Sequence, residues 1–363
     1  MKKVMIVDDS ALMRRVESDI LTSDGRFEVG AVARNGREAL DILEHQSFDV
    51  ILLDVNMPIM DGIQFMEEIN KRGSGEKVVI SSTLASEGGS VTIRALELGA
   101  VDFIQKPSSA AEMKDGSYVA RFLEIVDTAS KMPKHRVTSM VKNLFTIDKT
   151  SRPPSSTGSP GIKTPLPVRR SNAKKIVAIA SSTGGPAALQ KVIPLLPSNL
   201  DAPVLLVQHM PKGFTKSLAE RLDSCSNVNV KEAVEGDIPE KGHVYIARGG
   251  SHMVLGRDGA IHYTDEPPRE GVKPCANYMY ESLIDSRYEE IVCVVMTGMG
   301  QDGTNGITNL KKIKRNLFCI TQTEETCSVY GMPKAADRAG LSNKSVELGQ
   351  IAGEITAKVG VFA

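Results

Sequence analysis

Short apolar runs recur along the whole chain, and segments of helical spacing separate them. In the first 125 residues or so, Ala39, Leu40, Ile42 and Leu43 form one such helical face, and Ile93, Ala95, Leu96 and Leu98 form another. The apolar runs are Val4–Val7, Glu28–Ala33, Val50–Leu53, Val78–Ser81 and Val101–Gln105. This alternation predicts an α/β domain built on a parallel sheet.

Three apolar runs in the second half each lead into a residue with nucleophile, base or acid chemistry. The pairs are Ile176–Ala180 with Ser182, Val204–Gln208 with His209, and Ile291–Thr297 with Asp302. Short buried runs are typical of parallel strands, and ligands bind beyond the carboxyl ends of such strands. The pattern therefore predicts that a serine, a histidine and an aspartate meet at one edge, as acyl transfer requires.

The composition changes between the two halves. The stretch Pro153–Gly161 is rich in Pro, Ser and Gly and can bury little apolar area, which is typical of a linker. We therefore divide the chain into residues 1–122, an interdomain helix and linker over 123–172, and a second α/β domain over 173–363. A hairpin region is expected around His243 to Tyr263.

Charge and cysteine content narrow the class of protein. Lys plus Arg and Asp plus Glu both number 44 in 363 residues, so no global positive field recruits nucleic acid or anionic lipid. No apolar run approaches the roughly 20 residues that a membrane span needs, and acids follow the N-terminus too soon for a signal peptide. The five cysteines show no metal-ligand spacing, which favours reduced thiols in a cytoplasmic protein.

Acidic residues stand at the ends of the predicted N-terminal strands. Asp8 and Asp9 follow the first apolar run, Asp54 ends the third and Lys106 follows the fifth. Any one of these acids is more often a solvated loop residue, but that explanation is weak for the three acids and Lys106 together. Clustered carboxylates favour Mg²⁺, and a carboxylate beside Mg²⁺ and a lysine can accept a phosphoryl group.

These residues resemble a response-regulator receiver domain over residues 1 to about 122. The matching motifs are Val7–Ser10, Asp54–Gly62 and Lys106-Pro107. The resemblance implies a flavodoxin-like fold with strand order 2-1-3-4-5. It also implies that Asp54 is the phosphoacceptor, that Mg²⁺ is held by Asp8, Asp9, Asp54 and the Asn56 carbonyl, and that Lys106 and Ser82 respond to the phosphate. Ser81 and Thr83 adjoin Ser82 and stay open as alternatives.

The C-terminal residues have alternative explanations. The turn around Ser182 contains Thr183, Gly184 and Gly185 and resembles a nucleophile elbow, but the same letters suit a simple turn or helix cap. The chain order Ser, His, Asp disfavours an α/β-hydrolase, whose order is Ser, Asp, His. The run Gly298–Gly303 also fits a dinucleotide loop, although Asp302 would then repel the pyrophosphate.

Residues 173–363 resemble the catalytic domain of the CheB family of chemotaxis protein-glutamate methylesterases. The matching stretches are Ser182–Gly185, Gln208–Thr215, Thr297–Gly303 and Val329–Pro333. The resemblance implies a doubly wound α/β domain in which Ser182 is the nucleophile, His209 the base and Asp302 its orienting acid. Thr183 and the Met299 backbone would form the oxyanion site. The sequence departs from the family at Ala180-Ser181, Arg248 and Cys275–Asn277, where the family usually has Gly-Ala, Pro and Ser-Val-Asp.

The two resemblances together imply a phosphorylation-activated enzyme. It would hydrolyse glutamate methyl esters on chemoreceptor helices without a cofactor, would be phosphorylated by a histidine kinase, and could also deamidate receptor glutamines. The unphosphorylated receiver is expected to pack over the Ser182 edge. Two alternatives are a receiver fused to a non-catalytic signalling module and a DNA-binding regulator. The densest basic cluster, Lys311–Arg315, fits a solvated helix end better than a recognition helix.

Overall fold

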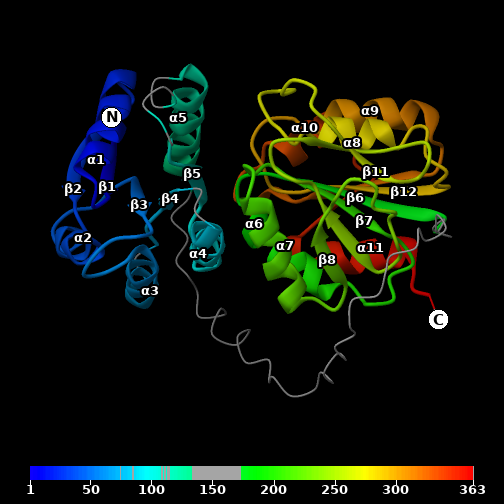
Figure 1. The fold of residues 1–363 in the computed structure, drawn as a ribbon, viewed down its shortest axis with the longest axis horizontal. Helices are drawn as coiled ribbons and strands as arrows, with labels where there is room; N and C mark the ends of the chain where they lie inside the picture. The colour runs from blue at the N-terminus through cyan, green and yellow to red at the C-terminus, as the bar shows by residue number, and fades with distance from the viewer. Residues whose placement is uncertain are drawn as a thin grey trace, which may run out of the picture.

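The computed structural model describes residues 1–73, 75–83, 86–107, 109, 112, 115–132 and 173–362. These residues form two α/β domains (Figure 1). The stretch Pro153–Gly161, predicted to be a linker, lies outside the described residues. Within the described part of the chain, no helix combines the length and apolar character needed to cross a membrane.

The N-terminal domain is a five-stranded parallel sheet in the order β2-β1-β3-β4-β5, which confirms the predicted order. Helices α1 and α5 cover one face, and α2, α3 and α4 cover the other. The elements are β1 (Lys2–Val7), α1 (Ala11–Asp24), β2 (Phe27–Ala33), α2 (Gly36–Leu43), β3 (Val50–Asp54), α3 (Gly62–Arg72), β4 (Val78–Ser82), α4 (Ser86–Glu97), β5 (Asp102–Gln105) and α5 (Gly116–Lys131).

Helix α5 extends further than the sequence division at residue 122 suggests. Asp115 caps its start by accepting a hydrogen bond from the Ser117 amide at 3.1 Å. Phe122, Ile125 and Val126 are buried against the sheet and α1. Residue 122 therefore lies inside a helix of the first domain, and the packed unit continues to the end of α5.

The C-terminal domain is a seven-stranded parallel sheet in the order β14-β13-β12-β6-β7-β9-β8. Helices α6, α7 and α11 pack on one face and α8, α9 and α10 on the other, so the domain is doubly wound (Figure 1). The elements are β6 (Lys175–Ser181), α6 (Gly185–Val192), β7 (Val204–Gln208), α7 (Phe214–Cys225), β8 (Asn229–Glu232), β9 (His243–Ile246), β10 (His252–Leu255), β11 (Ile261–Thr264), α8 (Ala276–Ser282), β12 (Glu290–Val295), α9 (Thr304–Ile313), β13 (Leu317–Gln322), α10 (Met332–Arg338), β14 (Lys344–Val346) and α11 (Ile351–Val359).

The predicted hairpin is shorter than expected. Strand β9 joins the main sheet, where it pairs in parallel with β7 and β8. Only β10 and β11 form the antiparallel hairpin, with His252 opposite Thr264. The apolar side chains of β9, including Val244 and Ile246, are fully buried, and burial on a central sheet explains why this run does not behave as a surface hairpin strand.

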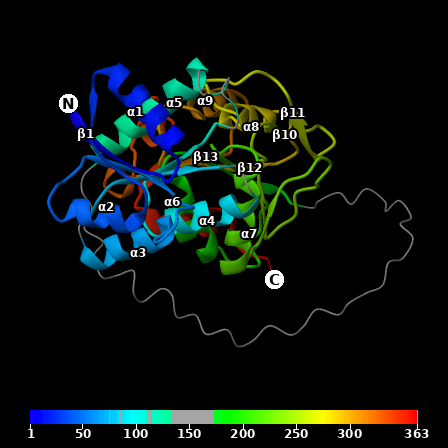
Figure 2. The same ribbon diagram turned by 60° about the vertical axis from the view of Figure 1, so that its left-hand side comes forward.

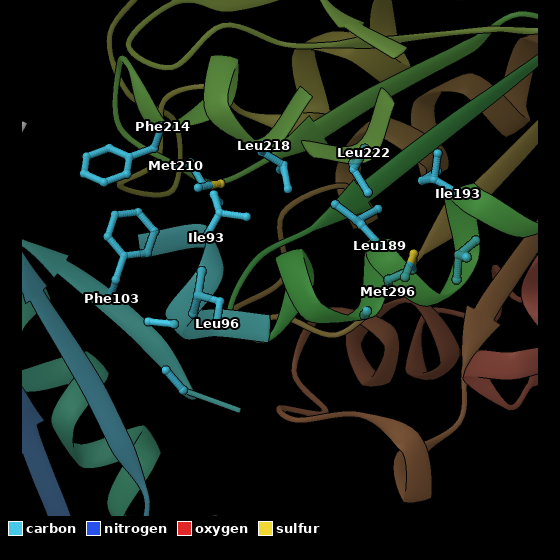
Figure 3. Packing of buried hydrophobic residues seen from close by; sticks show 14 of the residues in the cluster. Ile93, Leu96, Phe103, Leu189, Ile193, Met210, Phe214, Leu218, Leu222 and Met296 are labelled. Carbon is cyan, nitrogen blue, oxygen red and sulfur yellow. The ribbon is translucent and has the colours of Figure 1, made fainter. Parts of the chain in front are cut away.

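One continuous hydrophobic cluster connects the two domains. Helix α4 packs against α6 and α7 (Figure 2). Ile93, Leu96 and Phe103 face Met210, Phe214 and Leu218 across the boundary (Figure 3). The rings of Phe103 and Phe214 have centroids 4.6 Å apart, and Glu97 forms an ion pair with Arg221. Apolar burial therefore holds the first domain on one side of the second.

Candidate active site

The three neighbouring strands β12, β6 and β7 place the predicted triad residues at one edge of the sheet. Ser182 follows β6 and His209 follows β7, and the His209 amide donates to the Ser181 carbonyl at 3.1 Å. The Ser182 amide donates to the Thr297 carbonyl at 3.0 Å, which ties the serine to the segment that leads into Asp302. The parallel topology thus brings together residues that lie far apart in the sequence.

Two members of the predicted triad are already hydrogen-bonded. His209 Nε2 lies 2.8 Å from Asp302 Oδ2, and both side chains are buried. Within the described residues, the Ser182 hydroxyl has no hydrogen-bond partner, so the serine is not joined to this pair. With Nε2 directed at the carboxylate, the other ring nitrogen, Nδ1, remains for a proton from the serine.

The turn after β6, which holds Ser182, depends on two glycines. Gly184 has a φ of 74°, a conformation that favours glycine, and α6 begins directly after it. A Cβ on Gly185 would lie 2.0 Å from Gln208 Oε1, so only glycine fits there. Within the described residues, the amides of Thr183 and Met299 have no hydrogen-bond partner, and both are therefore free to donate to an oxyanion.

The buried side chain of Gln208 forms hydrogen bonds with the turn that holds Ser182. Gln208 Nε2 donates to the Ser182 carbonyl at 2.9 Å, and Gln208 Oε1 accepts from the Ser181 hydroxyl at 2.7 Å. Ser181 is one of the positions at which the sequence departs from the family pattern. Here the additional hydroxyl satisfies a buried amide oxygen, which would otherwise lack a partner.

The environment of Asp302 favours the carboxylate. Burial alone would raise its pKa, but hydrogen bonds from His209, Cys275 and the Ala276 amide hold the pKa below its usual range. An ionised Asp302 accepts the Nε2 proton of His209 and so leaves Nδ1 unprotonated. Sequence reasoning missed the contribution of Cys275. Its only sequence signal is that Cys275 lies in a segment that departs from the family pattern.

The acids predicted in the first domain also converge. Oxygens of Asp8, Asp9 and Asp54 lie within 4.8 Å of one another, close enough to ligate one cation. Lys106 Nζ bridges Asp8 Oδ2 at 2.6 Å and Asp54 Oδ2 at 2.9 Å. Burial raises the pKa of Asp54 although Lys106 opposes the shift, and the carboxylates of Asp54 and Asp8 raise the pKa of Lys106 against its burial. Oxygen ligands of this kind suit Mg²⁺.

The serines at the end of β4 face different helices. Ser81 donates to Glu17 Oε1 in α1 at 2.8 Å. Ser82 accepts a hydrogen bond from Thr92 in α4 at 3.0 Å. Burial raises the pKa of Glu17 to about 7. Ser81 is thus bonded to a buried acid that the sequence analysis does not identify. Asn56 is exposed in the loop after β3, two residues after Asp54.

The first domain contacts both predicted oxyanion residues. Thr183 Oγ1 donates to Asp102 Oδ2 at 2.6 Å, and both groups are buried. Thr128 Oγ1 of α5 donates to Met299 Sδ at 2.9 Å. The desolvation of Asp102 raises its pKa although Arg121 and Thr183 lower it. Sequence reasoning missed Asp102 and Thr128, because contacts across 81 and 171 residues have no local signature.

Comparison with known proteins gives consistent findings for both domains. The CheB methylesterase family matches residues 177–355, and the response regulator receiver domain family matches residues 4–116. The protein-glutamate methylesterase/protein-glutamine glutaminase of Bacillus subtilis strain 168 is 40% identical over 366 residues, covering 99% of each chain.

One further relative and one solved domain are similar to parts of this chain. The protein of the same name from Pyrococcus abyssi is 40% identical over 352 residues, covering 96% of this chain and 91% of its own. The crystal structure of the Thermotoga maritima CheB methylesterase catalytic domain is 38% identical. It covers 51% of this chain and 98% of its own, with a TM-score of 0.48.

Proposed function

The chain belongs to the CheB family of protein-glutamate methylesterases with a receiver domain, and we propose that Ser182, His209 and Asp302 perform its hydrolytic reaction. The observation that supports this assignment is their position at the ends of three adjacent strands, with His209 already bonded to Asp302 at 2.8 Å. The substrates would be glutamate methyl esters on the cytoplasmic helices of chemoreceptors. The alternative of a non-catalytic signalling module is not favoured.

Acylation begins with the serine. Ser182 Oγ attacks the γ-carbonyl carbon of the methyl ester, while His209 Nδ1 takes the hydroxyl proton. Asp302 remains ionised and stabilises the imidazolium through Nε2. The tetrahedral intermediate collapses when His209 returns the proton to the leaving methoxide, which departs as methanol. The required Ser182–His209 contact forms once the serine side chain rotates toward Nδ1.

Water completes the cycle by the same path. His209 deprotonates a water molecule, the resulting hydroxide attacks the acyl carbon, and Ser182 regains its proton as the glutamate carboxylate is released. A glutamine substrate would follow identical steps with ammonia as the leaving group. The names of the relatives include glutaminase activity, and we extend that activity to this chain on the same residues.

Backbone donors would stabilise the oxyanion. Among the described residues the amides of Thr183 and Met299 have no partner; Thr183 directly follows Ser182, and Met299 lies two residues after Thr297, whose carbonyl accepts from the Ser182 amide. Loss of one well-placed donor of this kind raises a barrier by about 2.7–4 kcal/mol. The protein's own residues therefore supply nucleophile, base and oxyanion site, and we propose that ester hydrolysis needs no cofactor.

The receiver would control access. A histidine kinase would transfer a phosphoryl group to Asp54, with Mg²⁺ held by Asp8, Asp9, Asp54 and the Asn56 carbonyl. The cation would neutralise charge at the phosphoryl group. Lys106 would exchange its carboxylate contacts for phosphate oxygens. Ser82, rather than Ser81, would follow the phosphate, since Ser81 is bonded to Glu17.

We propose that the unphosphorylated receiver inhibits the enzyme by direct contact. Asp102 engages Thr183 and Thr128 engages Met299, so the receiver touches both sides of the proposed oxyanion site. Phosphorylation adds roughly 1.5 to 2 negative charges beside Lys106, just beyond the strand that contains Asp102. That change is large enough to bias the receiver between a docked and an undocked position.

Release of methanol from methylated receptor tests the proposal. Wild type and Ser182→Ala are compared with and without a phosphodonor and Mg²⁺, and Ser224→Ala, at an exposed serine of α7, is the control. We expect Ser182→Ala to lose methanol release under both conditions and the control to retain it. Unchanged release by Ser182→Ala would support the non-catalytic alternative.

A further inference from the structure

The carboxylate of Asp302 is enclosed by more donors than a triad requires. Oδ2 accepts from His209 Nε2 at 2.8 Å and from the Ala276 amide at 2.5 Å. Oδ1 accepts from Cys275 Sγ at 3.0 Å and from the Asn277 amide at 3.0 Å. Two donors on each oxygen fix the rotation of the carboxylate plane. Within the described residues, Cys275 is the one side chain besides His209 that bonds to this carboxylate.

The segment that donates to Asp302, residues 275–277, is itself held in place by His252 of β10. The Cys275 amide donates to His252 Nδ1 at 3.1 Å, and His252 Nε2 lies 3.1 Å from the Glu266 carbonyl. His252 is fully buried, and its ring packs on Tyr278 with centroids 4.4 Å apart. The β10 strand therefore sets the position of Cys275 without contributing to the carboxylate directly.

Asn277 joins the same segment to the loop that contains the acid. Its Oδ1 accepts from the amides of Gly303 and Gly306 at 3.2 and 2.6 Å. Its Nδ2 donates to Glu270 Oε1 at 3.0 Å. The backbone on both sides of the carboxylate is thus cross-linked, and a small change at Cys275 will act on Asp302 rather than be absorbed by loop movement.

We propose that Cys275 is a positioning residue for the catalytic triad, whose thiol proton holds Oδ1 of Asp302 and thereby keeps Oδ2 aimed at His209. This inference rests on the proposed function, since it assigns Asp302 the role of orienting His209. It adds a residue that acts through Asp302 and touches neither substrate nor the attacking serine.

The chemistry of the thiol fits this role. Burial, together with the adjacent Asp302 carboxylate, raises the pKa of Cys275 far above its usual range, so the sulfur keeps its proton and remains a donor. A protonated, fully buried thiol is a poor nucleophile, and Cys275 therefore does not compete with Ser182. Serine at the same position would retain a donor, whereas alanine or valine would not.

Steady-state methanol release by the full-length protein with phosphodonor and Mg²⁺ tests the proposal. We expect Cys275→Ala and Cys275→Val to lower kcat about threefold to tenfold, the loss of one hydrogen bond to a charged group, with KM unchanged. Cys275→Ser should stay within about twofold of wild type because a hydroxyl donates to the carboxylate as well as a thiol does.

A matched control separates positioning from packing. Cys293 is an equally buried thiol on β12, and among the described residues it forms no hydrogen bond with Asp302 or His209, so Cys293→Ala creates a similar small cavity and should leave kcat unchanged. Valine fills the space that alanine leaves, so agreement between the two Cys275 variants excludes a cavity effect.

The outcomes are distinguishable from failure of the proposed function. If Ser182→Ala is inactive and Cys275→Ala and Cys275→Val keep the wild-type kcat, the positioning role is wrong while the triad stands. A serine variant as impaired as the alanine variant would also overturn the positioning role. If Ser182→Ala stays active, the proposed function itself fails.

Discussion

Each domain places buried carboxylates at the carboxyl edge of a parallel sheet, but the two edges treat the negative charge differently. Asp302 receives donors on both oxygens, and its pKa is lowered despite burial. Asp54 receives the Val55 amide and shares Lys106 with Asp8, and its pKa is raised by burial. Both sheets are parallel, so the difference comes from the local surroundings of each carboxylate. Asp302 has four donors, whereas Asp54 has the Val55 amide, a lysine shared with Asp8, and the like charge of Asp8 nearby.

This difference fits the two kinds of chemistry that we propose for Asp302 and Asp54. An orienting acid must stay ionised throughout a reaction cycle, and fixed donors secure that state. A phosphoacceptor site must instead take up charge and change it. The receiver gathers the carboxylates of Asp8, Asp9 and Asp54, and Lys106 forms ion pairs with Asp8 and Asp54, which leaves an excess of negative charge that a divalent cation can neutralise. The fixed carboxylate of Asp302 and the acidic cluster of Asp8, Asp9 and Asp54 thus both lie at the carboxyl edge of a parallel sheet.

The largest effect on activity is expected at Asp302, whose carboxylate accepts two hydrogen bonds on each oxygen. Asp302→Asn should lower kcat for methanol release by about 10⁴, because an asparagine amide does not hold His209 in the tautomer with a free Nδ1. Asp285→Asn, which changes an exposed acid paired with Arg257, is the control and should keep full activity. A loss below about tenfold would contradict the comparison.

A change in the acidic cluster of the receiver should affect activity only when phosphodonor and Mg²⁺ are present. Asp54→Asn should leave the basal rate intact and abolish stimulation by phosphodonor and Mg²⁺, a change on the order of tenfold or more in the stimulated rate. The same assay on Asp41→Asn, an exposed acid of α2, should retain stimulation. Equal rates for Asp54→Asn and stimulated wild type would refute gating by this residue.

The contact between the two regions can be broken at Asp102. Removal of its carboxylate in Asp102→Ala deletes the hydrogen bond to Thr183, so the basal rate without phosphodonor should rise about threefold to tenfold. Glu124→Gln, at an exposed acid of α5, tests whether any loss of charge on the receiver has this effect. An unchanged or lower basal rate for Asp102→Ala would argue against the inhibitory contact.

The smallest effect concerns stability. The pKa of Glu17 is raised to about 7 from 4.5, so the folded protein binds this proton more tightly than the unfolded chain. Stability should therefore fall as pH rises from about 4.5 to about 7, by on the order of 3 kcal/mol at most. Glu17→Gln should remove this fall.

Thermal unfolding at pH 5 and pH 8 measures the Glu17 effect. The difference in melting temperature between Glu17→Gln and wild type should favour the variant more at pH 8 than at pH 5. Glu67→Gln, on the exposed surface of α3, should show no such pH-dependent gain. Parallel pH dependence of wild type and Glu17→Gln would contradict the prediction.

The sequence was informative where the physics is local. Apolar runs such as Val50–Leu53 predicted buried parallel strands, and the residues after each run could be assigned to one edge. The same rule predicts Ser182, His209 and Asp302 at one edge of the second sheet. The acidic residues of the receiver followed from the same rule.

Other features depend on packing between distant segments. The contacts of Cys275 with Asp302, of Ser81 with Glu17 and of Asp102 with Thr183 each join elements separated by loops or whole domains. The hydrophobic periodicity of the sequence does not predict such long-range pairs. The sequence misplaces strand β9 for a related reason, since its four residues fit a hairpin as well as the interior of a sheet.

The shared hydrophobic cluster around Phe103 and Phe214 has a thermal consequence. Attraction between apolar surfaces weakens as water cools, whereas the covalent chain and the hydrogen bonds within each domain persist. The apolar part of the attraction between the two domains should therefore weaken on cooling, while the Glu97–Arg221 ion pair and the Thr183–Asp102 hydrogen bond also cross the boundary.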